Sequence, residues 1–449
     1  MRKVLSIAGS DSGGGAGIQA DLKTFAALGV HGMTAVTAVT AQNTVGVSMI
    51  HEVPPVVIRS QIDAVVEDVG VDAVKTGMLQ CSEVIDAVAD AVEYHRLPNL
   101  VVDPVMVATS GARLLESSAL ETLIMRLIPL AKVLTPNTGE AEILARQRIN
   151  TVDEAKLAAR KIIEQGPEAV LVKGGHLDTP GKAVDVLCVE GDYRIIESPL
   201  VDTVNTHGTG CSLSSGIAAG LAKGFSVYEA VSDAKRLVYK GIKHGLKIGE
   251  GAGPLNPLAV LYDDAEKAIV LEEIRKAVEV IEAAPATRSL IAECQMNIGM
   301  ALSHAVGPED VVAVDGRLTK HMGGVRAMGC PRFGASHHIA NTILAVREYE
   351  PRLRSALNLR YSEEAVNVLE EMGLLVSYYD RREEPEEYKD VEGMTTRWGS
   401  GEAMRRVEGA PDAIYHLGDW GKEPMIVLIG ENPSELARCV VVLAERLGE

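Results

Sequence analysis

The segment VLSIAGSDSGGGAGIQAD, from Val4 to Asp21, contains the strand, loop and helix start that most clearly indicate the fold of the first part of the chain. Val4 to Ala8 is a short apolar run typical of a buried strand. Gly9 to Gly17 then holds five glycines in nine residues and leads into a helix, and glycines allow a backbone to approach a ligand closely. The loop matches neither the dinucleotide fingerprint GxGxxG nor the phosphate loop GxxxxGK followed by Ser or Thr. By itself it leaves two interpretations open, a ligand-binding loop or a tight strand-to-helix connection.

Strands and helices alternate from this stretch up to Leu246. The pattern predicts buried parallel strands at 33–39, 100–103, 132–135 and 169–173, and apolar residues recur at helical spacing over 56–69 and 84–92. Two adjacent helices, 212–223 and 227–246, close the unit. This alternation predicts a doubly wound α/β domain, in which ligands bind at the carboxyl ends of the strands.

Glycines and prolines over 249–257 predict a domain boundary. Beyond it, an apolar stripe over 271–281 predicts a helix, and strands near 311–314, 374–379, 413–417 and 425–429 alternate with helices near 336–349, 362–372 and 434–447. We expect two α/β domains, 1–262 and 270–449, with no internal repeat between them.

The composition is that of a globular enzyme rather than a disordered or fibrous chain, with 47% hydrophobic and 24% charged residues. A formal net charge of −18 repels phosphate backbones and anionic lipids, so nucleic acid and membrane partners are not expected. Six scattered cysteines without a CxxC pair predict reduced thiols. The chain has no apolar run of about 18 residues and no signal-peptide pattern at its start, and we expect a cytoplasmic location.

A second glycine segment, NTHGTGC from Asn205 to Cys211, immediately precedes a helix of small residues. Free N–H groups and the helix dipole make such a helix start an anion site. Cys211 lies at this start, where the pKa of a thiol is expected to be lowered, so its thiolate or its N–H could face a transferring phosphoryl group. The alternative is a small residue in tight helix packing.

Eight motifs, in order over residues 1–255, resemble the hydroxymethylpyrimidine/phosphomethylpyrimidine kinases, the thiamine-pathway branch of the ribokinase-like fold. They are IAGSD (7–11), GGAGIQADLKT (14–24), TAQNT (40–44), KTGML (75–79), VDPVM (102–106), TPNTGE (135–140), KGGH (173–176) and NTHGTGC (205–211). The resemblance implies phosphorylation of the hydroxymethylpyrimidine alcohol and then of its monophosphate, with ATP and Mg²⁺.

The resemblance also implies roles for individual side chains. Gln42 is similar to the pyrimidine reader of the family, and its amide offers a donor and an acceptor to an aminopyrimidine. The other implied pyrimidine contacts are Gly9, Asp21, Met78 and Val105, and the implied nucleotide contacts are Lys173, Thr206, His207, Gly208, Gly210 and Lys235. Asp103 and Glu140 are the implied Mg²⁺ ligands, as hard oxygen donors. Cys211 stands where sugar kinases of this fold carry an Asp base, and either takes the proton of the alcohol or lines an anion hole.

In the second domain, cations, glycines and imidazoles cluster at 316–317, 323–326 and 331–338. The sequence Gly334-Ala-Ser336 leads into a helix and predicts another anion site. Adjacent helical residues such as His337 and His338 diverge by about 100°, which argues against a shared metal ion and for solvated or packing imidazoles.

This domain resembles, over 270–449, the thiamine-phosphate synthase domain found fused behind such kinases, with a three-layer α/β sandwich as the implied fold. The matching residues are 297–300, 315–317, 333–340, Asp419, 421–424 and Gly430. The implied reaction joins the pyrimidine pyrophosphate to thiazole phosphate and releases pyrophosphate. Arg317 is the implied catalytic Arg, able to meet the leaving group bidentately, and His338 the implied catalytic His. Arg326, Arg332 and Lys422 are weaker phosphate candidates.

We therefore expect a bifunctional, homo-oligomeric enzyme whose first domain makes the substrate of the second. Two alternatives stay open: a pyridoxal kinase of the same fold, and a second domain that is a non-catalytic sensor of thiamine phosphate.

Overall fold

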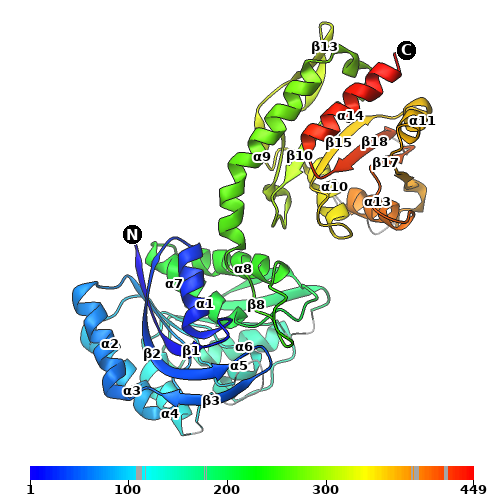
Figure 1. The fold of residues 1–449 in the computed structure, drawn as a ribbon. Coiled ribbons are helices and arrows are strands. Elements are labelled where there is room, and N and C mark those ends of the chain that lie inside the picture. The colour runs from blue at the N-terminus through cyan, green and yellow to red at the C-terminus, as the bar shows by residue number, and fades with distance from the viewer. Residues whose placement is uncertain are drawn as a thin grey trace. The chain divides into compact units, whose positions relative to one another are not determined.

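The protein forms two compact units, Met1–Leu261 and Tyr262–Glu449, in the computed structural model. The structure describes residues 1–448 except 108–113, 117, 176, 178, 386–387, 389–393 and 419–422. Each unit has its own sheet (Figure 1). No helix among these described residues is both long enough and apolar enough to cross a membrane.

Unit 1 is built on a nine-stranded sheet in the order β3-β2-β1-β4-β5-β6-β7-β8-β9. The strands are β1 Lys3–Asp11, β2 His31–Gln42, β3 Val47–Glu52, β4 Ala73–Thr76, β5 Leu100–Val102, β6 Val133–Leu134, β7 Ala169–Val172, β8 Lys182–Val189 and β9 Asp192–Pro199. The pairings from β2 to β7 are parallel, which confirms the predicted core of buried parallel strands. The sheet as a whole is mixed, because β3, β8 and β9 run antiparallel at its two edges.

Helices cover both faces of this sheet, so the prediction of a doubly wound domain is confirmed. The helices are α1 Gly17–Ala27, α2 Pro55–Asp68, α3 Ser82–His95, α4 Ala119–Thr122, η1 Leu123–Leu127, η2 Ile128–Leu130, α5 Thr138–Ala145, α6 Val152–Ile163, α7 Thr209–Ala222 and α8 Val227–Lys243. Successive strand residues serve opposite faces: Val4 packs with α1, α7 and α8, whereas Leu5 packs with α2 and α3. Gly216 of α7 touches Ala234 of α8, and this close contact explains the small residues of α7.

The boundary between the units falls between residues 261 and 262, at the end of the first expected domain, 1–262. The segment 249–257 is irregular but remains part of unit 1, since Gly253 O accepts from His207 N and Pro254 O accepts from Leu246 N. The helix α9, Ala259–Glu282, then runs without a break through the position that separates the units. The residues 263–269, left between the two expected domains, belong to this helix.

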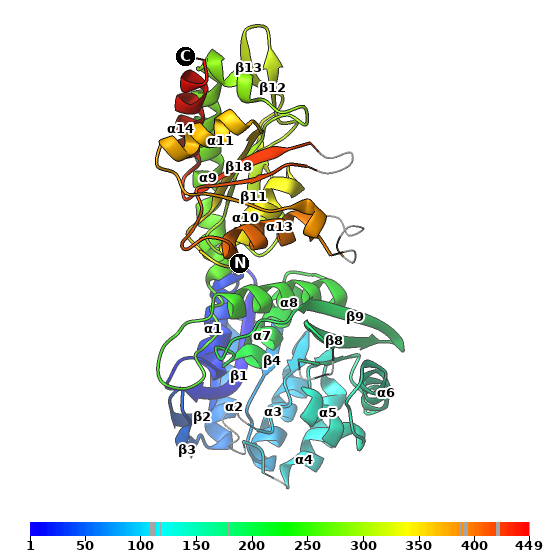
Figure 2. The same ribbon diagram turned by 90° about the vertical axis from the view of Figure 1, so that its right-hand side faces the viewer.

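Unit 2 is built on a seven-stranded sheet in the order β14-β11-β10-β15-β18-β17-β16. The strands are β10 Ile298–Ala301, β11 Val311–Val314, β14 Pro331–Phe333, β15 Ser355–Arg360, β16 Val376–Tyr378, β17 Ala413–His416 and β18 Met425–Gly430, with a separate hairpin of β12 Leu318–His321 and β13 Gly324–Ala327. The remaining elements are η3 Pro285–Leu290, η4 Pro308–Asp310, α10 His337–Arg347, α11 Glu363–Glu371, η5 Arg381–Glu383, α13 Met394–Arg405 and α14 Pro433–Arg446. Figure 2 shows α11 and α14 on one side of the sheet and α10 and α13 on the other, so the predicted α/β sandwich is confirmed.

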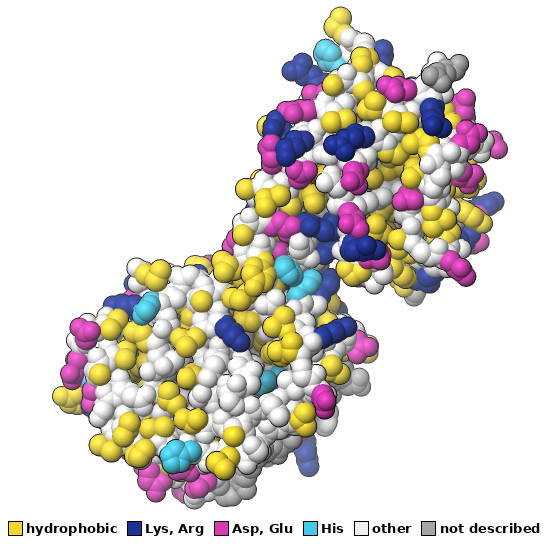
Figure 3. Space-filling model, viewed as in Figure 1, with side chains coloured by type: hydrophobic (Ala, Val, Ile, Leu, Met, Phe, Trp, Pro, Cys, Tyr) yellow, Lys and Arg dark blue, Asp and Glu magenta, His cyan; other side chains and the backbone are white. Residues whose placement is uncertain are grey.

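Acidic side chains accompany the basic ones on the face of each unit drawn in Figure 3, in keeping with the net charge of −18.

Candidate active site

A cavity of about 480 Å³ opens in unit 1 where the carboxyl ends of the parallel strands meet the start of α7. Its walls include the residues after β1, β4, β5 and β7. Of the site residues predicted in this unit, the following line it: Gly9, Gln42, Met78, Asp103, Val105, Glu140, Lys173, Thr206, His207, Gly208, Gly210, Cys211 and Lys235. Asp21 does not line it. The fold thus brings together residues that are up to 226 positions apart, Gly9 and Lys235.

Two carboxylates and one lysine form the acidic corner of the cavity. Lys173 Nζ lies 2.9 Å from Asp103 Oδ1. Glu140 belongs to the capping box of α5, where its carboxylate accepts from Asn137 N at 2.8 Å. Burial raises the pKa of Glu140 to about 7; Lys173 opposes this shift and the negative charge of Asp103 adds to it.

These groups fit a hard divalent cation, which would relieve the repulsion between the two carboxylates. Among the residues that the structure describes, no three His, Cys, Asp or Glu side chains are placed to hold a metal by themselves. A site of two carboxylates completed by water and phosphate oxygens is the kind that Mg²⁺ prefers.

The start of α7 forms the anion-binding side of the cavity. Gly208 is its N-cap with φ of 79° and offers no side-chain cap. Thr209 N donates to Thr206 O at 3.3 Å, and the N–H groups of Gly210 and Cys211, which follow it, are the ones left for a ligand. Cys211 lies in this first turn. Burial raises the pKa of its thiol to about 11, although the positive charge of Lys75 acts in the opposite direction. The expectation of a lowered thiol pKa is therefore wrong, because loss of water outweighs the helix dipole.

A buried charge pair lies behind this wall. Lys75 Nζ is 2.9 and 3.0 Å from the two carboxylate oxygens of Asp21, and both side chains are fully buried. Asp21 also accepts hydrogen bonds of 2.6 Å from Ser6 and from Ser215. Lys75 lines the cavity, so Asp21 contacts a lining residue rather than the cavity itself. The sequence analysis gave Lys75 no role of its own, because nothing in the local pattern links it to Asp21.

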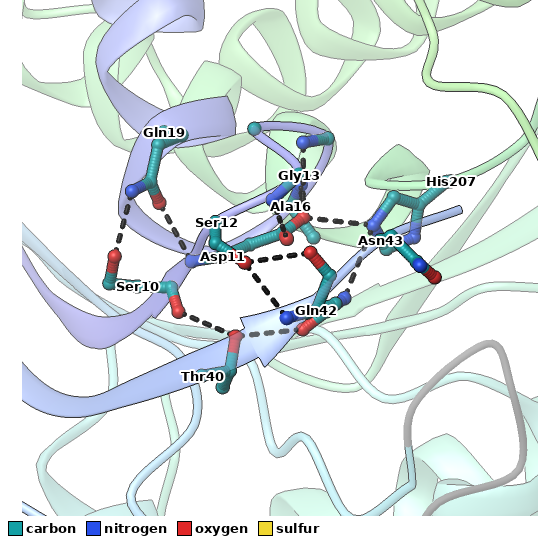
Figure 4. Close-up of polar contacts among 12 residues, drawn as sticks. Ser10, Asp11, Ser12, Gly13, Ala16, Gln19, Thr40, Gln42, Asn43 and His207 are labelled. Atoms are coloured by element: carbon teal, nitrogen blue, oxygen red, sulfur yellow. Dashed lines mark hydrogen bonds and ion pairs between the residues drawn. The ribbon is translucent and has the colours of Figure 1, made fainter. Parts of the chain in front are cut away.

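The first glycine loop is filled by its own carboxylate. Asp11 accepts from Gly13 N at 2.8 Å, Gly15 N at 3.0 Å and Ala16 N at 2.8 Å, as Figure 4 shows in part. These N–H groups are thus not available to a phosphate, although Gly9, Asp11 and Gly17 of the loop line the cavity. His207 Nε2 lies 3.0 Å from Asp11 Oδ2, which ties the two glycine segments together.

Lys235 occupies the far end of the cavity. Its Nζ lies 2.7 Å from Asp185 Oδ2, and Asp185 also accepts from Gly174 N at 2.9 Å. Asp185 sits on the antiparallel strand β8, which the sequence analysis missed, so this pairing could not be foreseen.

In unit 2 the two predicted catalytic residues lie in separate sets of contacts. Arg317 has φ of 68° and donates from its guanidinium to the backbone oxygen of Cys294. Glu423 accepts from Cys294 N at 2.9 Å. The predicted phosphate candidate Lys422 and the motif residue Asp419 lie outside the described residues.

His338 lies in the first turn of α10, with Nδ1 3.3 Å from the hydroxyl of Thr396 on α13. His416, at the end of β17, is 4% exposed. Burial lowers the pKa of His416 to about 4, and the positive charges of Arg381 and His338 add to this shift. Sequence analysis missed His416 because no motif surrounds it.

Fold and cavity together define a small-molecule kinase: a doubly wound sheet, a helix start open to phosphate, and lysines and carboxylates around one site. The family model described as phosphomethylpyrimidine kinase matches residues 11–256, and the chain belongs to this family. The model described as thiamine-phosphate synthase ThiN matches residues 273–441. The chain therefore joins a ribokinase-like hydroxymethylpyrimidine/phosphomethylpyrimidine kinase domain to a thiamine-phosphate synthase domain and serves thiamine biosynthesis, as the resemblance implied.

Relatives support this assignment for the first unit. The hydroxymethylpyrimidine/phosphomethylpyrimidine kinase of Bacillus subtilis is 45% identical over 257 residues, which cover 57% of this chain and 95% of that protein. The thiamine biosynthesis bifunctional protein ThiED of Geobacter sulfurreducens is 47% identical over 260 residues, or 58% of this chain and 53% of that protein. An ADP complex of Bacillus subtilis pyridoxal kinase is 39% identical with a TM-score of 0.54, covering 58% of this chain and 99% of that one.

Proposed function

We propose that the cavity described in unit 1 performs two successive phosphoryl transfers from ATP, first to the hydroxymethyl group of the pyrimidine and then to the phosphate so formed. The observation that carries this proposal is the meeting of the α7 start, Lys173 and two carboxylates around a single space. Phosphoryl transfer needs mainly positioning and charge stabilisation, which these groups supply.

We assign the predicted site residues to two groups, those that contact the pyrimidine and those that contact the nucleotide, its phosphates or Mg²⁺. Gln42, Gly9, Met78 and Val105 would contact the pyrimidine, and Asp21 would act by holding Lys75. The proposed nucleotide and phosphate contacts are Lys173, Thr206, Gly208, Gly210 and Lys235, with Asp103 and Glu140 as the proposed ligands of Mg²⁺. His207, proposed from the resemblance as a further nucleotide contact, turns its ring toward the first glycine loop.

The raised pKa of the Cys211 thiol favours a role for this residue in an anion hole over a role as the catalytic base. A thiol with a pKa of about 11 is almost entirely protonated at neutral pH, so it is a poor proton acceptor. We propose that its backbone N–H, in the first turn of α7, faces the transferring phosphoryl group. A Cys211→Ala variant keeps this N–H and should retain turnover within about tenfold; a loss of several hundredfold would restore the role of base.

In unit 2, we propose that Arg317 meets the departing pyrophosphate and that His338 orients or protonates a phosphate oxygen. Arg317→Ala and His338→Ala should each abolish formation of thiamine phosphate while kinase rates stay unchanged. Unchanged synthesis in either variant would refute that assignment.

A single incubation tests the whole sequence. Full-length protein is mixed with hydroxymethylpyrimidine, Mg-ATP and thiazole phosphate, and every pyrimidine species is followed by mass. Thiamine phosphate is the expected end product. Accumulation of pyrimidine pyrophosphate alone would make unit 2 the thiamine-phosphate sensor named above.

Pyridoxal is the second candidate alcohol, because the similar Bacillus subtilis structure is a pyridoxal kinase. Competition between the two alcohols at equal concentration decides this point. We expect the pyrimidine to be phosphorylated preferentially. The hydroxymethylpyrimidine/phosphomethylpyrimidine kinase of Bacillus subtilis is 45% identical to this chain, whereas the pyridoxal kinase of that organism is 39% identical.

We also propose a cytoplasmic location and a homo-oligomer. Support for the first comes from cysteines that are all free thiols. Support for the second comes from the edge of the unit 1 sheet, where Val39 is 50% and Met49 69% exposed. Light scattering on the full chain gives the oligomeric state directly.

A further inference from the structure

The carboxamide of Gln42 sits between two polar partners, as Figure 4 shows. On one side, Thr40 Oγ1 lies 2.9 Å from Ser10 O and 3.2 Å from Gln42 Oε1. On the other side, His207 Nε2 lies 3.0 Å from Asp11 Oδ2 and 3.4 Å from Gln42 Nε2. Thr40 belongs to β2 and His207 to the loop before α7, and both line the cavity, as Gln42 itself does.

The Thr40 hydroxyl can only accept a hydrogen bond from Gln42. A hydroxyl has one hydrogen, and the carbonyl oxygen of Ser10 has none to offer. The 2.9 Å contact with Ser10 therefore uses the hydrogen of Thr40. The atom of Gln42 that faces Thr40 must supply a hydrogen, so it is the carboxamide nitrogen.

His207 can only donate toward Gln42. Burial raises the pKa of Asp11, but hydrogen bonds from His207 and from Ala16 N and Gly13 N outweigh this and leave the pKa below its usual value. Asp11 is therefore an ionised acceptor, and His207 Nε2 must carry the hydrogen between them. A protonated nitrogen offers no lone pair, so the atom of Gln42 that faces it is the carboxamide oxygen.

Thr40 and His207 thus each require, independently, the same orientation of the Gln42 carboxamide. Rotation of the carboxamide by 180° exchanges the positions of its oxygen and nitrogen and satisfies both partners. We propose that Asp11 and His207 act as positioning residues that hold the Gln42 oxygen toward His207 and its nitrogen toward Thr40. This orientation fixes the order of donor and acceptor that the cavity presents to the ring of its alcohol substrate. The inference rests on the proposed role of Gln42 as the reader of that ring.

The pair is built to be rigid. Asp11 is held by three backbone N–H groups of its own loop. The side chain of His207 is only 13% exposed, and its ring packs so closely on Gly15 that a Cβ there would overlap it. The orientation of Gln42 is therefore set before the substrate binds.

A fixed carboxamide separates two classes of ring. A 4-aminopyrimidine offers a donating amine beside an accepting ring nitrogen, whereas its 4-oxo analogue offers an acceptor beside a donating N–H. Because the hydroxymethyl group must point to the transferred phosphate, the ring cannot turn over to restore the match. The 4-oxo analogue would leave buried polar groups unpaired, which is costly.

The test compares His207→Leu with the matched variant His207→Gln, whose amide N–H replaces Nε2–H. Dissociation constants for the amino and oxo alcohols are measured by calorimetry without ATP, and kcat and KM are measured with ATP. In His207→Leu we expect the preference for the amino alcohol over the oxo alcohol to fall about tenfold, in the dissociation constants as in kcat/KM. His207→Gln should keep the preference.

Further variants separate this inference from the proposed function. Gln42→Ala alone tests the reader: if it leaves the binding of both alcohols unchanged, the role of Gln42 fails and the inference fails with it. If Gln42→Ala weakens binding, the double variant Gln42→Ala/His207→Leu should bind no more weakly than Gln42→Ala, because His207 acts through Gln42.

Thr40→Val removes the other partner of Gln42 and should also lower the preference for the amino alcohol, so it tests the inference even if His207→Leu folds poorly.

Additive losses of binding in Gln42→Ala/His207→Leu would overturn the inference. So would a His207→Leu variant whose only change is a raised KM for ATP, which would return His207 to the nucleotide.

Discussion

The buried pair of Lys75 and Asp21 makes a quantitative prediction about stability. The ammonium contacts both carboxylate oxygens, at 2.9 and 3.0 Å, and neither side chain is exposed. The pair joins β4 to α1, and the hydroxyl of Ser215 connects it to α7. Lys75→Met keeps most of the side-chain volume and leaves the carboxylate of Asp21 buried without its cation.

The expected loss is large because an unpaired buried charge remains. Removal of one partner from such a pair costs about 3–5 kcal/mol, whereas neutral replacement of both partners is often tolerated. In a domain of this size, about 1 kcal/mol corresponds to about 2–4 °C in Tm. We therefore expect the melting temperature of unit 1 to fall by about 6–20 °C in Lys75→Met. Lys75→Met/Asp21→Asn should regain at least about 2 kcal/mol of that loss.

Calorimetry of the full chain records the unfolding of both units, and tryptophan fluorescence follows the unfolding of unit 2 alone. Both tryptophans, Trp398 and Trp420, belong to unit 2, so their transition should not move. Lys182→Met is the matched control, since Lys182 pairs with Glu197 at 2.7 Å with side chains 57% and 46% exposed. It should cost less than about 1 kcal/mol. A Lys75→Met variant as stable as this control, or a double variant less stable than the single one, would refute the reasoning.

Three further predictions concern other residues. Since the Cys211 thiol has a pKa of about 11, its alkylation by iodoacetamide should be slow at pH 7 and rise about tenfold per pH unit up to pH 10; equal rates at pH 7 and 9 would contradict this. Burial lowers the pKa of His416 to about 4, so between pH 6.5 and 4 the unfolded chain binds a proton that the folded chain does not. The free energy of unfolding of unit 2 should therefore fall by about 3 kcal/mol over that range, and this loss should be absent in His416→Gln. Gly208→Ala should destabilise unit 1 more than Gly224→Ala in thermal unfolding: both have positive φ, 79° and 91°, but only at Gly208 would a Cβ overlap a backbone oxygen, that of Gly15.

Local patterns predicted the parts of the fold that are stabilised locally. The central strands of unit 1 are continuous apolar runs because both faces of a parallel sheet are buried. The strands β3, β8 and β9 were missed. β3 and β9 are largely exposed and lack such runs, and in β8 the charged Asp185 interrupts the apolar run although Val184 to Cys188 are buried. The break expected near residue 257 was correct as a loop, but the loop returns to His207 and the chain continues as α9.

The candidate site divides in the same way. The resemblance to the kinase family implied Asp103, Glu140 and Lys173, and the helix start pointed to Cys211. All four line one cavity, because segments that follow parallel strands converge at one edge of the sheet. The state of each group was not readable from the motifs. The helix start alone predicts an acidic thiol at Cys211, yet its pKa is raised, because burial depends on everything packed around it.

The sequence supplied the candidate site residues, their order, and the assignment of two α/β units of the thiamine pathway to one chain. The pairing of those residues follows from the fold alone: Asp11 fills its own glycine loop and holds His207, 196 positions away, and Asp21 is matched to Lys75 rather than to the cavity. Sequence motifs and periodicity report on residues that are near one another in the chain. Charge pairing, desolvation and the direction of a hydrogen bond depend instead on atoms that only the fold brings within about 3 Å of each other.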